Sequence, residues 1–379
     1  MSEFPKTPSL DLLKVEPILL RARIETPVVT SFGKMEERAV LLVRAEEKDG
    51  TVGWGEVFGN FPAHGAENRE HLIHDYIAPL ALSETWLSPA DAFKAITKRT
   101  HIMSLQAGEP GPFAQAIAGV DIALWDIAAR KLGQPLWKLL GGTRNCIPTY
   151  ASGLNPSDFE EIVMHKLNEG YAAFKIKIGF GRETDFAALS KMRNLIGNLP
   201  LMADVNQGWD VDTACANWED YSAFDLLWIE EPLPADRPLD EWQRIASLGG
   251  SPIAAGENLL SEKQFDEHIG AQAFNVVQPD ICKWGGFTKT LPLARRIVGA
   301  GLTYCPHFLA GPIGVMASAH CLAAAGGDGV LEIDANPNPI REELTGGLPR
   351  IEDGIMAIAE GPGLGIEPDA SKLDKFTAS

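Results

Sequence analysis

From about residue 131 onward, short apolar runs alternate with segments that fit helices. Each apolar run has the length of a buried strand, and a plausible helix follows it. The predicted strands span 148–151, 172–178, 200–205, 226–230, 252–256, 274–278, 302–306 and 330–333. Strands that alternate with helices pair in parallel through right-handed crossovers. Eight such units predict an α/β fold, a closed (β/α)₈ barrel of the TIM type, over residues 131–350.

The first 130 residues follow a different pattern. Strand-like runs such as "AVLLVRAEEKDGTVGWGEV" mix with helical stretches, and Asp49 and Gly50 stand between two strands as in a hairpin. Residues 114–133 predict a helix whose apolar surface is too wide for an exposed helix, ended by Gly133 and Pro135. An α+β unit over residues 1–130 is therefore expected.

Composition agrees with a folded protein of two domains. The chain has 379 residues, of which 45% are hydrophobic and 22% charged, without a low-complexity tract. Its five cysteines are scattered and never spaced C-x-x-C, which indicates reduced structural thiols. Cys305 precedes His307 by two residues and shares its strand face.

Net charge limits the partners. At −18, the chain offers no basic stripe for nucleic acid and no attraction to anionic membranes. No apolar run of about 18 residues occurs, and the N-terminus lacks a basic start followed by an apolar stretch. A cytoplasmic protein without nucleic-acid or membrane partners is expected.

One ionisable residue stands at or just after the carboxyl end of seven predicted strands. By subtraction, these residues recur every 23 to 27 positions. They are Lys177, Asp204, Glu230, Glu257, Asp280, His307 and Glu332. Because the carboxyl ends of barrel strands form the active-site face, we expect these side chains to converge on one mouth.

Three acids on successive strands predict a metal site. Asp204, Glu230 and Glu257 would repel one another if unpaired in a semi-buried mouth. A ligand set of oxygens alone favours Mg²⁺, with Mn²⁺ as the alternative. Glu231 is the weaker candidate of its pair because strand alternation turns it away from the Glu230 side.

The remaining strand-end residues predict two bases. Asp280 can accept from one imidazole nitrogen of His307 and leave the other to move a proton. Lys177 enters from the other side of the mouth, and Lys175 beside it would lower its pKa. A Lys-x-Lys pair in a strand more often marks a solvated face, but the acids that follow favour a barrel interior.

These motifs together resemble those of a known family. "KIKIG", "DVNQ", "WIEEP", "GEN", "QPDICKWGG", "PH", the final Glu332 and "DIALWDIAARKLGQPLWKLLGG" at 121–142 are similar to the mandelate racemase subgroup of the enolase superfamily. The resemblance implies a modified barrel, a capping domain over 1–130, and a segment 351–379 that returns to it. It also implies one Mg²⁺ per subunit on Asp204, Glu230 and Glu257, and a homo-oligomer between dimer and octamer.

The implied chemistry is removal of the proton α to a carboxylate of a small molecule. The intermediate is an enediolate dianion, which Mg²⁺ and Lys175 would stabilise. Glu332, if protonated, would donate a hydrogen bond to it from the opposite side.

The step after proton removal stays open. "LEIDANPNPIREE" and "GPGLGIE" look closest to acid-sugar dehydratases and sugar-lactone cycloisomerases, which favours dehydration to a 2-keto-3-deoxy acid. The alternatives are a racemase or epimerase of a 2-hydroxy acid and a cycloisomerase. Lys283 matches the racemase branch.

Substrate choice is expected in the loops 26–38 and 57–70, with His64, Asn206 and Lys283 as candidate contacts. Two other functions are weighed. "GFGRE" at 179–183 could cradle a phosphate, but it lacks the third glycine of a dinucleotide-binding loop. A catalytically silent, metal-stabilised barrel is disfavoured because both bases are present.

Overall fold

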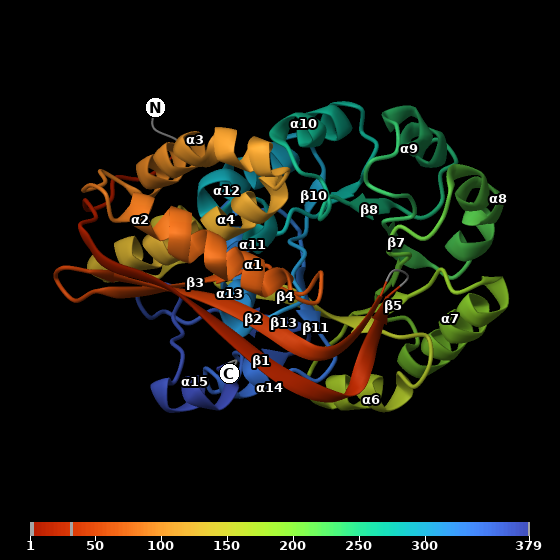
Figure 1. The fold of residues 1–379 in the computed structure, drawn as a ribbon. Coiled ribbons are helices and arrows are strands. Elements are labelled where there is room, and N and C mark those ends of the chain that lie inside the picture. Colours follow the sequence, from red (N-terminus) through yellow and green to blue (C-terminus); the bar gives the residue numbers. More distant parts are fainter. Residues whose placement is uncertain (1–3, 31–32, 378–379) are drawn as a thin grey trace.

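The computed structural model describes residues 4–30 and 33–377, which contain two sheets (Figure 1). The first has three antiparallel strands: β1 (Leu12–Thr30), β2 (Gly33–Glu47) and β3 (Val52–Val57). The strands of the second are β4 (Cys146–Leu154), β5 (Phe174–Lys177), β6 (Leu201–Asp204), β7 (Leu226–Glu230), β8 (Ile253–Ala255), β9 (Val276–Val277), β10 (Thr303–Tyr304), β11 (Leu331–Asp334), β12 (Ile351–Glu352) and β13 (Ile355–Ala357).

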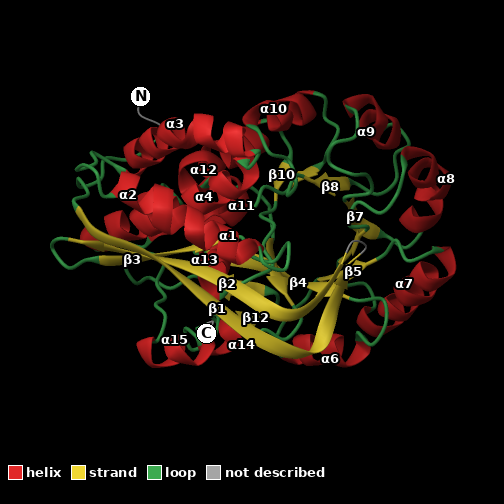
Figure 2. Ribbon diagram, in the orientation of Figure 1, coloured by secondary structure: helices red, strands yellow, loops and turns green. Residues whose placement is uncertain are grey.

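Helices follow or cover these strands (Figure 2). Before the barrel lie α1 (Gly65–Leu72), the π-helix η1 (Ile73–Ile77), α2 (Ala78–Ala81), α3 (Pro89–Ala107), α4 (Pro110–Lys131) and α5 (Leu136–Leu139). Around the barrel lie α6 (Glu160–Asn168), α7 (Arg182–Ile196), α8 (Val211–Ser222), α9 (Leu239–Ala246), α10 (Glu262–Gly270), α11 (Ile281–Trp284), α12 (Gly286–Gly299), α13 (Pro312–Ala325), α14 (Pro339–Glu343) and α15 (Ala370–Phe376).

All eight predicted barrel strands are confirmed as β4 to β11. They pair in parallel in the order β10-β9-β8-β7-β6-β5-β4, and β11 pairs with the other side of β4. Strands β9 and β10 are shorter than predicted, and each ends two residues before a proline, which has no N–H for a sheet ladder.

A hydrogen bond to a side chain links the segments next to β10 and β11, where the barrel closes. Within the described residues no backbone ladder joins these strands; instead the Val330 amide donates to Cys305 Sγ at 3.4 Å. Burial raises the pKa of the Cys305 thiol to about 12, so it stays protonated. The five cysteines are free, as the sequence predicted.

The N-terminal sheet and α4 form the core of the capping unit. The predicted hairpin is confirmed: the Glu47 amide donates to Thr51 O at 2.9 Å, and Gly50 takes a φ of +89°. Helix α4 is long and apolar enough to cross a membrane, but 89% of its most apolar window is buried between β3 and the barrel helices α11 and α12. It therefore fits a core helix.

Buried acids dock the capping unit onto the barrel. Glu56 on β3 accepts from the Gly311 and Gly314 amides, 2.6 and 2.8 Å away, at the start of α13. These amides are donors that the helix itself leaves unpaired. Asp121 on α4 accepts from the amide and the hydroxyl of Thr288 on the barrel helix α12, at 3.0 and 2.6 Å. The cap is thus fixed over the end of the barrel where α13 begins.

The C-terminal segment contacts both parts. Strands β12 and β13 form a hairpin that extends the barrel sheet, because β13 pairs antiparallel with β4. Further on, Gly363 bridges to Pro135, and Thr377 bridges to Leu20 on β1.

His320 on α13 gives the fold a predictable pH dependence. Its Nδ1 accepts from the Trp137 amide at 2.9 Å and its Nε2 lies 3.1 Å from Leu364 O, an arrangement that requires the neutral ring. Burial lowers the pKa of His320 to about 4. Since the unfolded ring titrates near 6.5, the unfolded state binds more protons between pH 6.5 and 4.

We therefore expect His320 to cost the fold about 3 kcal/mol as pH falls from 7 to 4. Urea unfolding across this range should show a steeper loss for the natural protein than for His320→Gln. His165→Gln, on the 69% exposed His165 of α6, is the control and should keep the natural slope. Equal slopes in the natural protein and His320→Gln would contradict the assignment.

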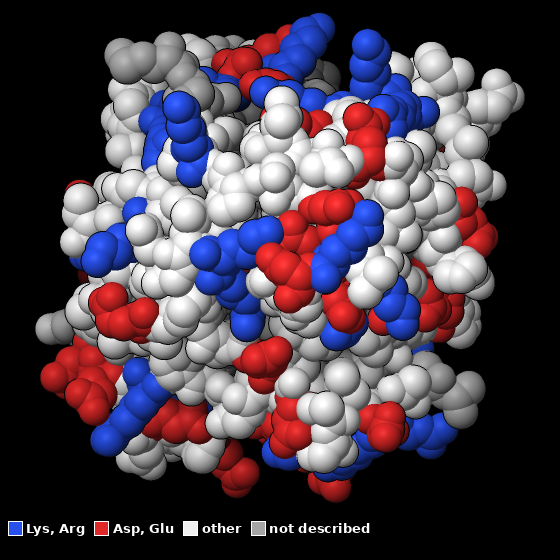
Figure 3. All heavy atoms as spheres, turned by 90° about the vertical axis from the view of Figure 1, so that its left-hand side faces the viewer, with Lys and Arg blue, Asp and Glu red and all other residues white. Residues whose placement is uncertain are grey.

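Charge on the capping side of the molecule is mixed. In Figure 3, lysines and arginines alternate with acids among the coloured residues, and no continuous basic stripe crosses this face. Charges of both signs are therefore interspersed on this face.

Candidate active site

A cavity of about 320 Å³ lies between the capping unit and the barrel mouth. Its barrel wall includes Gly153, Lys177, Asp204, Asn206, Gln207, Glu257, Asn258, Lys283, His307, Leu309, Asp334 and Asn336. Its cap wall consists of Val28, Met35, Arg38, Phe58, Asn60, Phe61, Arg69 and Gln115. Val28 of β1 and Met35 of β2 thus reach the same space as the strand-end residues.

Both lysines of β5 face the barrel interior and are nearly fully buried. Lys175 forms ion pairs with Glu230 and, at 2.7 Å, with Glu332. Burial opposes its charge, but the two carboxylates outweigh burial and raise the pKa of Lys175. Lys177 lines the cavity; burial, aided by Lys175, lowers its pKa, in the direction that the sequence predicted.

Asp204 ends β6 at the cavity wall. Its Oδ1 accepts from the Asn206 amide and its Oδ2 from the Asn206 side chain, both at 2.8 Å. Asn206 has a φ of +47°, a left-handed turn that brings its side chain back beside Asp204. Burial and the charge of Glu257 raise the pKa of Asp204.

Glu230 lies deeper than the cavity wall. It pairs with Lys175 and accepts from Trp228 Nε1 at 3.0 Å and Gln278 Nε2 at 2.7 Å. Burial, with the charges of Asp204 and Glu332, raises the pKa of Glu230 to about 7 despite Lys175.

The expectation for Glu231 is wrong. The side-chain Nδ2 of Asn258 donates to both Glu231 (2.8 Å) and Glu257 (2.9 Å), so Glu231 lies beside the site and not behind it. Glu231 has a φ of +40°, which breaks strand alternation at the end of β7. Burial and the neighbouring charges of Glu257 and Asp204 raise its pKa well above the ordinary value.

His307 is held between two carboxylates. Its Nδ1 lies 2.8 Å from Asp280, as predicted, and its Nε2 lies 2.7 Å from Glu257. Asp280 is itself fixed by the Cys282 amide at 2.8 Å. Burial disfavours the imidazolium, but Glu257, Glu332 and Asp280 outweigh burial and raise the pKa of His307.

The structure corrects the expected protonation of Glu332. Its Oε1 accepts from Ser152 at 2.6 Å and faces Lys175, and its Oε2 accepts from the Phe308 amide at 3.0 Å. Although burial opposes ionisation, Lys175 and His307 lower its pKa. Glu332 is therefore an ionised acceptor here and does not donate a hydrogen bond.

Of the predicted substrate contacts outside the strand ends, Lys283 lines the cavity and His64 does not. Lys283 Nζ donates to Asn258 at 2.5 Å, lies 3.6 Å from Glu257 and stands over the Phe58 ring. Phe58 and Phe61 line the cavity. His64 does not, since its side chain is 89% exposed beside Glu67. In the loop 26–38, residues 31–32 lie outside the described residues.

The "GFGRE" loop is not a phosphate cradle. Its Gly179 and Phe180 amides donate to Asp185 at 2.9 and 3.1 Å. The donors that a phosphate would need are therefore occupied within the protein.

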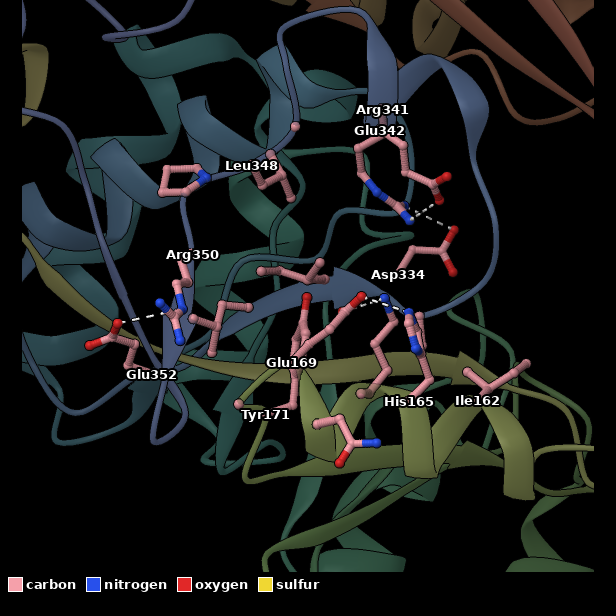
Figure 4. Close-up of a pocket in the computed structure, with 18 of the residues that line it drawn as sticks. Ile162, His165, Glu169, Tyr171, Asp334, Arg341, Glu342, Leu348, Arg350 and Glu352 are labelled. Atoms are coloured by element: carbon pink, nitrogen blue, oxygen red, sulfur yellow. Dashed lines mark hydrogen bonds and ion pairs between the residues drawn. The ribbon is translucent and has the colours of Figure 1, made fainter.

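A second hollow, of about 1040 Å³, lies outside the barrel between α6 and the segment 333–353 (Figure 4). Its charges pair locally: His165 lies 2.8 Å from Glu169, and Arg350 lies 3.5 Å from Glu352. It includes Asp334, which also lines the first cavity and joins Arg38 at 2.7 Å. Four of the seven strand-end residues line the first cavity, which is therefore the candidate site: Lys177, Asp204, Glu257 and His307.

The donor set at this cavity fits a hard divalent cation, although it is not gathered around one. Among the described residues, no group of three His, Cys, Asp or Glu side chains is arranged as metal ligands. Glu230 is turned to Lys175 and Glu257 to His307. Yet the charge of Glu257 helps to raise the pKa values of the buried Asp204 and Glu231, and a cation would relieve this repulsion.

Comparison with known proteins decides the family. A model described as "Enolase C-terminal domain-like" matches residues 159–372, and a model of the mandelate racemase/muconate lactonizing enzyme N-terminal domain matches residues 14–141. The chain belongs to the mandelate racemase/muconate lactonizing enzyme family. It is thus an enolase-superfamily enzyme, with the capped barrel that the family fold implies.

Relatives within this family have different reactions. D-galactarolactone cycloisomerase of Agrobacterium fabrum is 31% identical over 94% of this chain and 96% of its own length. A mandelate racemase/muconate lactonizing enzyme from Bordetella bronchiseptica is 44% identical, with a TM-score of 0.90 over 97% and 99% of the two chains. A variant of L-talarate/galactarate dehydratase, solved with Mg and L-glucarate, is 25% identical, with a TM-score of 0.85 over 98% and 93%.

Sequence reasoning did not identify the charged residues of the cap wall. Arg38 and Arg69 line the cavity from the capping unit. Arg69 lies in the predicted loop 57–70, but nothing in its neighbours distinguishes it from a surface arginine. Only the approach of the cap to the barrel brings it to the site.

Proposed function

We propose that this enzyme removes the proton α to a carboxylate of an acid sugar and expels the β-hydroxyl, giving a 2-keto-3-deoxy acid. The observation that carries the proposal is the entry of Lys177 and His307 into one cavity from strands five places apart in the sheet. A substrate between them has one proton-transfer group on each side.

In this reaction Lys177 takes the α-proton, and His307 gives a proton to the departing hydroxyl, which leaves as water. The resulting enol takes a proton at C3 and loses its hydroxyl proton to become the ketone, and solvent returns Lys177 and His307 to their starting protonation states. Asp280 orients the ring through Nδ1, and Nε2 points to Glu257 of the cavity wall. Lys175 provides a buried positive charge beside the site.

We also propose that Asp204, Glu230 and Glu257 hold Mg²⁺, with Mn²⁺ as the alternative ion. The cation would supply positive charge for the oxygens of the substrate carboxylate as the second negative charge develops. Asn206 positions Asp204 through two hydrogen bonds. The solved dehydratase relative with bound Mg supports this assignment.

Cycloisomerisation of a sugar lactone is the second candidate. The D-galactarolactone cycloisomerase relative, which matches nearly the whole chain, favours it. If the ring oxygen stands β to the free carboxylate, it replaces the hydroxyl as leaving group and the first step is unchanged. Racemisation would instead require His307 to return the proton to the opposite face.

The broader expectations remain proposals. We propose a cap over 1–130, a barrel over 131–350 and a returning segment 351–379. We also propose a small carboxylate substrate, a homo-oligomer and a cytoplasmic location.

The test follows proton NMR in D₂O. The purified protein with Mg²⁺ is incubated with mono- and diacid sugars and with their lactones. We expect a 2-keto-3-deoxy product from an open-chain acid. A product from lactones alone would indicate a cycloisomerase, and α-deuteration without elimination a racemase or epimerase. No exchange with any compound would contradict the proposal.

A further inference from the structure

Arg69 is a buried cation that no acid neutralises. Its side chain lies on α1, is 4% exposed and lines the cavity. Among the described residues, no acid lies within ion-pair distance of its guanidinium. Nε donates to Gln115 at 2.6 Å and Nη2 to Phe61 O at 3.3 Å, whereas Nη1 donates to no described residue. A buried guanidinium without an anion is costly unless a ligand supplies one.

Other cations of this cavity have acidic neighbours in the protein. Arg38 is paired with Asp334, and Lys283 lies near Glu257. Burial lowers the pKa of Arg69, opposed only by the more distant Glu109. Arg69 is thus a cavity cation whose charge is available to a substrate.

Phe58 of the loop 57–70 lies next to two cations of the cavity, Lys283 from the barrel and Arg69 from the cap. The Phe58 ring stands 4.8 Å from Lys283 Nζ on the barrel side and 5.9 Å from the Arg69 guanidinium on the cap side. The Phe58 amide donates to Cys282 O, which fixes this loop on the barrel. Gly65 leaves room for the guanidinium, since a methyl group there would lie 2.2 Å from Nη1.

We propose that Arg69 binds the distal carboxylate of a dicarboxylic acid sugar whose other carboxylate lies at the Lys177–His307 end of the cavity. A carboxylate matches the planar donors of a guanidinium and neutralises its charge. This inference rests on the proposed function and narrows its substrate class to diacids and their monolactones.

The test compares acids that differ only at the distal end, such as galactarate with galactonate and glucarate with gluconate. We expect kcat/KM of the natural enzyme to favour the diacids. Arg69→Met should lower kcat/KM for diacids by about 10- to 100-fold and change the values for monoacids by less than about 3-fold.

Arg21→Met is the matched control. It tests whether a lost hydrogen bond to the loop 57–70, and not a lost charge in the cavity, changes the substrate preference. Arg21 Nη2 donates to Ala63 O at 3.1 Å, near the Phe61 carbonyl that Arg69 holds, but Arg21 does not line the cavity. We expect Arg21→Met to keep the natural preference for diacids. Equal losses on diacids and monoacids in Arg69→Met, or the same loss of preference in Arg21→Met, would overturn the proposal.

Calorimetry separates this inference from the proposed reaction. With Mg²⁺ present, adipate and hexanoate probe the distal end without any hydroxyl to eliminate. If the natural protein binds adipate more tightly than hexanoate and Arg69→Met does not, the subsite is supported. Absence of turnover with every sugar acid would then count against the proposed reaction but not against the subsite. Equal binding of the two acids by the natural protein would overturn the subsite.

Discussion

Replacing either proposed proton-transfer group should reduce turnover by about 10²- to 10⁴-fold, with different effects on the two halves of the reaction. Lys177→Met removes the group proposed to take the α-proton. His307→Asn removes the group proposed to protonate the leaving hydroxyl. Both side chains are nearly fully buried at the cavity, so bulk water is a poor substitute for either.

Isotope exchange distinguishes the two roles. In D₂O with Mg²⁺, we expect His307→Asn to exchange the α-proton of an acid sugar without forming the keto acid. Lys177→Met should show neither exchange nor product. His165→Asn, on the outer hollow, is the control and should behave as the natural enzyme. Exchange of the α-proton in Lys177→Met but not in His307→Asn would mean that the two roles are reversed. Normal turnover in both variants would contradict both roles.

The barrel could be predicted from sequence because its signals are local and periodic. Each strand is an apolar run, and Lys175 and Lys177 reveal their common face through strand alternation alone. The convergence of Asp280 with His307 follows from the same rule, since consecutive strands end at one mouth.

The expectations that failed depend on non-local or irregular geometry. Glu231 departs from alternation because its φ is positive, which no residue type at that position announces. The ionised state of Glu332 depends on Lys175, 157 positions away by subtraction, and on the Phe308 backbone amide in the loop after β10. Arg69 reaches the site only because the cap docks through Glu56 and Asp121.

Removal of the divalent cation should have an effect as large as loss of a base. The proposed reaction adds a second negative charge to a bound carboxylate, in a site where buried acids already repel one another. Lys175 alone must then stabilise that charge while it is paired with Glu230 and Glu332. We expect protein treated with EDTA to lose at least about 10³-fold in turnover, and added Mg²⁺ to restore it.

The same cation should bind measurably without substrate. Because it relieves repulsion among buried carboxylates, Mg²⁺ should raise the midpoint of thermal unfolding, by a shift that grows with its concentration. Asp204→Asn replaces one negatively charged ligand with a neutral amide. Because the buried ion pair between Mg²⁺ and this carboxylate is lost, Mg²⁺ binding measured by calorimetry should weaken by about 10-fold or more. Asp212→Asn, at an 81% exposed acid paired with Arg244, should leave binding unchanged. Full activity after EDTA treatment, or unaltered Mg²⁺ affinity in Asp204→Asn, would contradict the metal assignment and leave Lys175 as the charge that stabilises the intermediate.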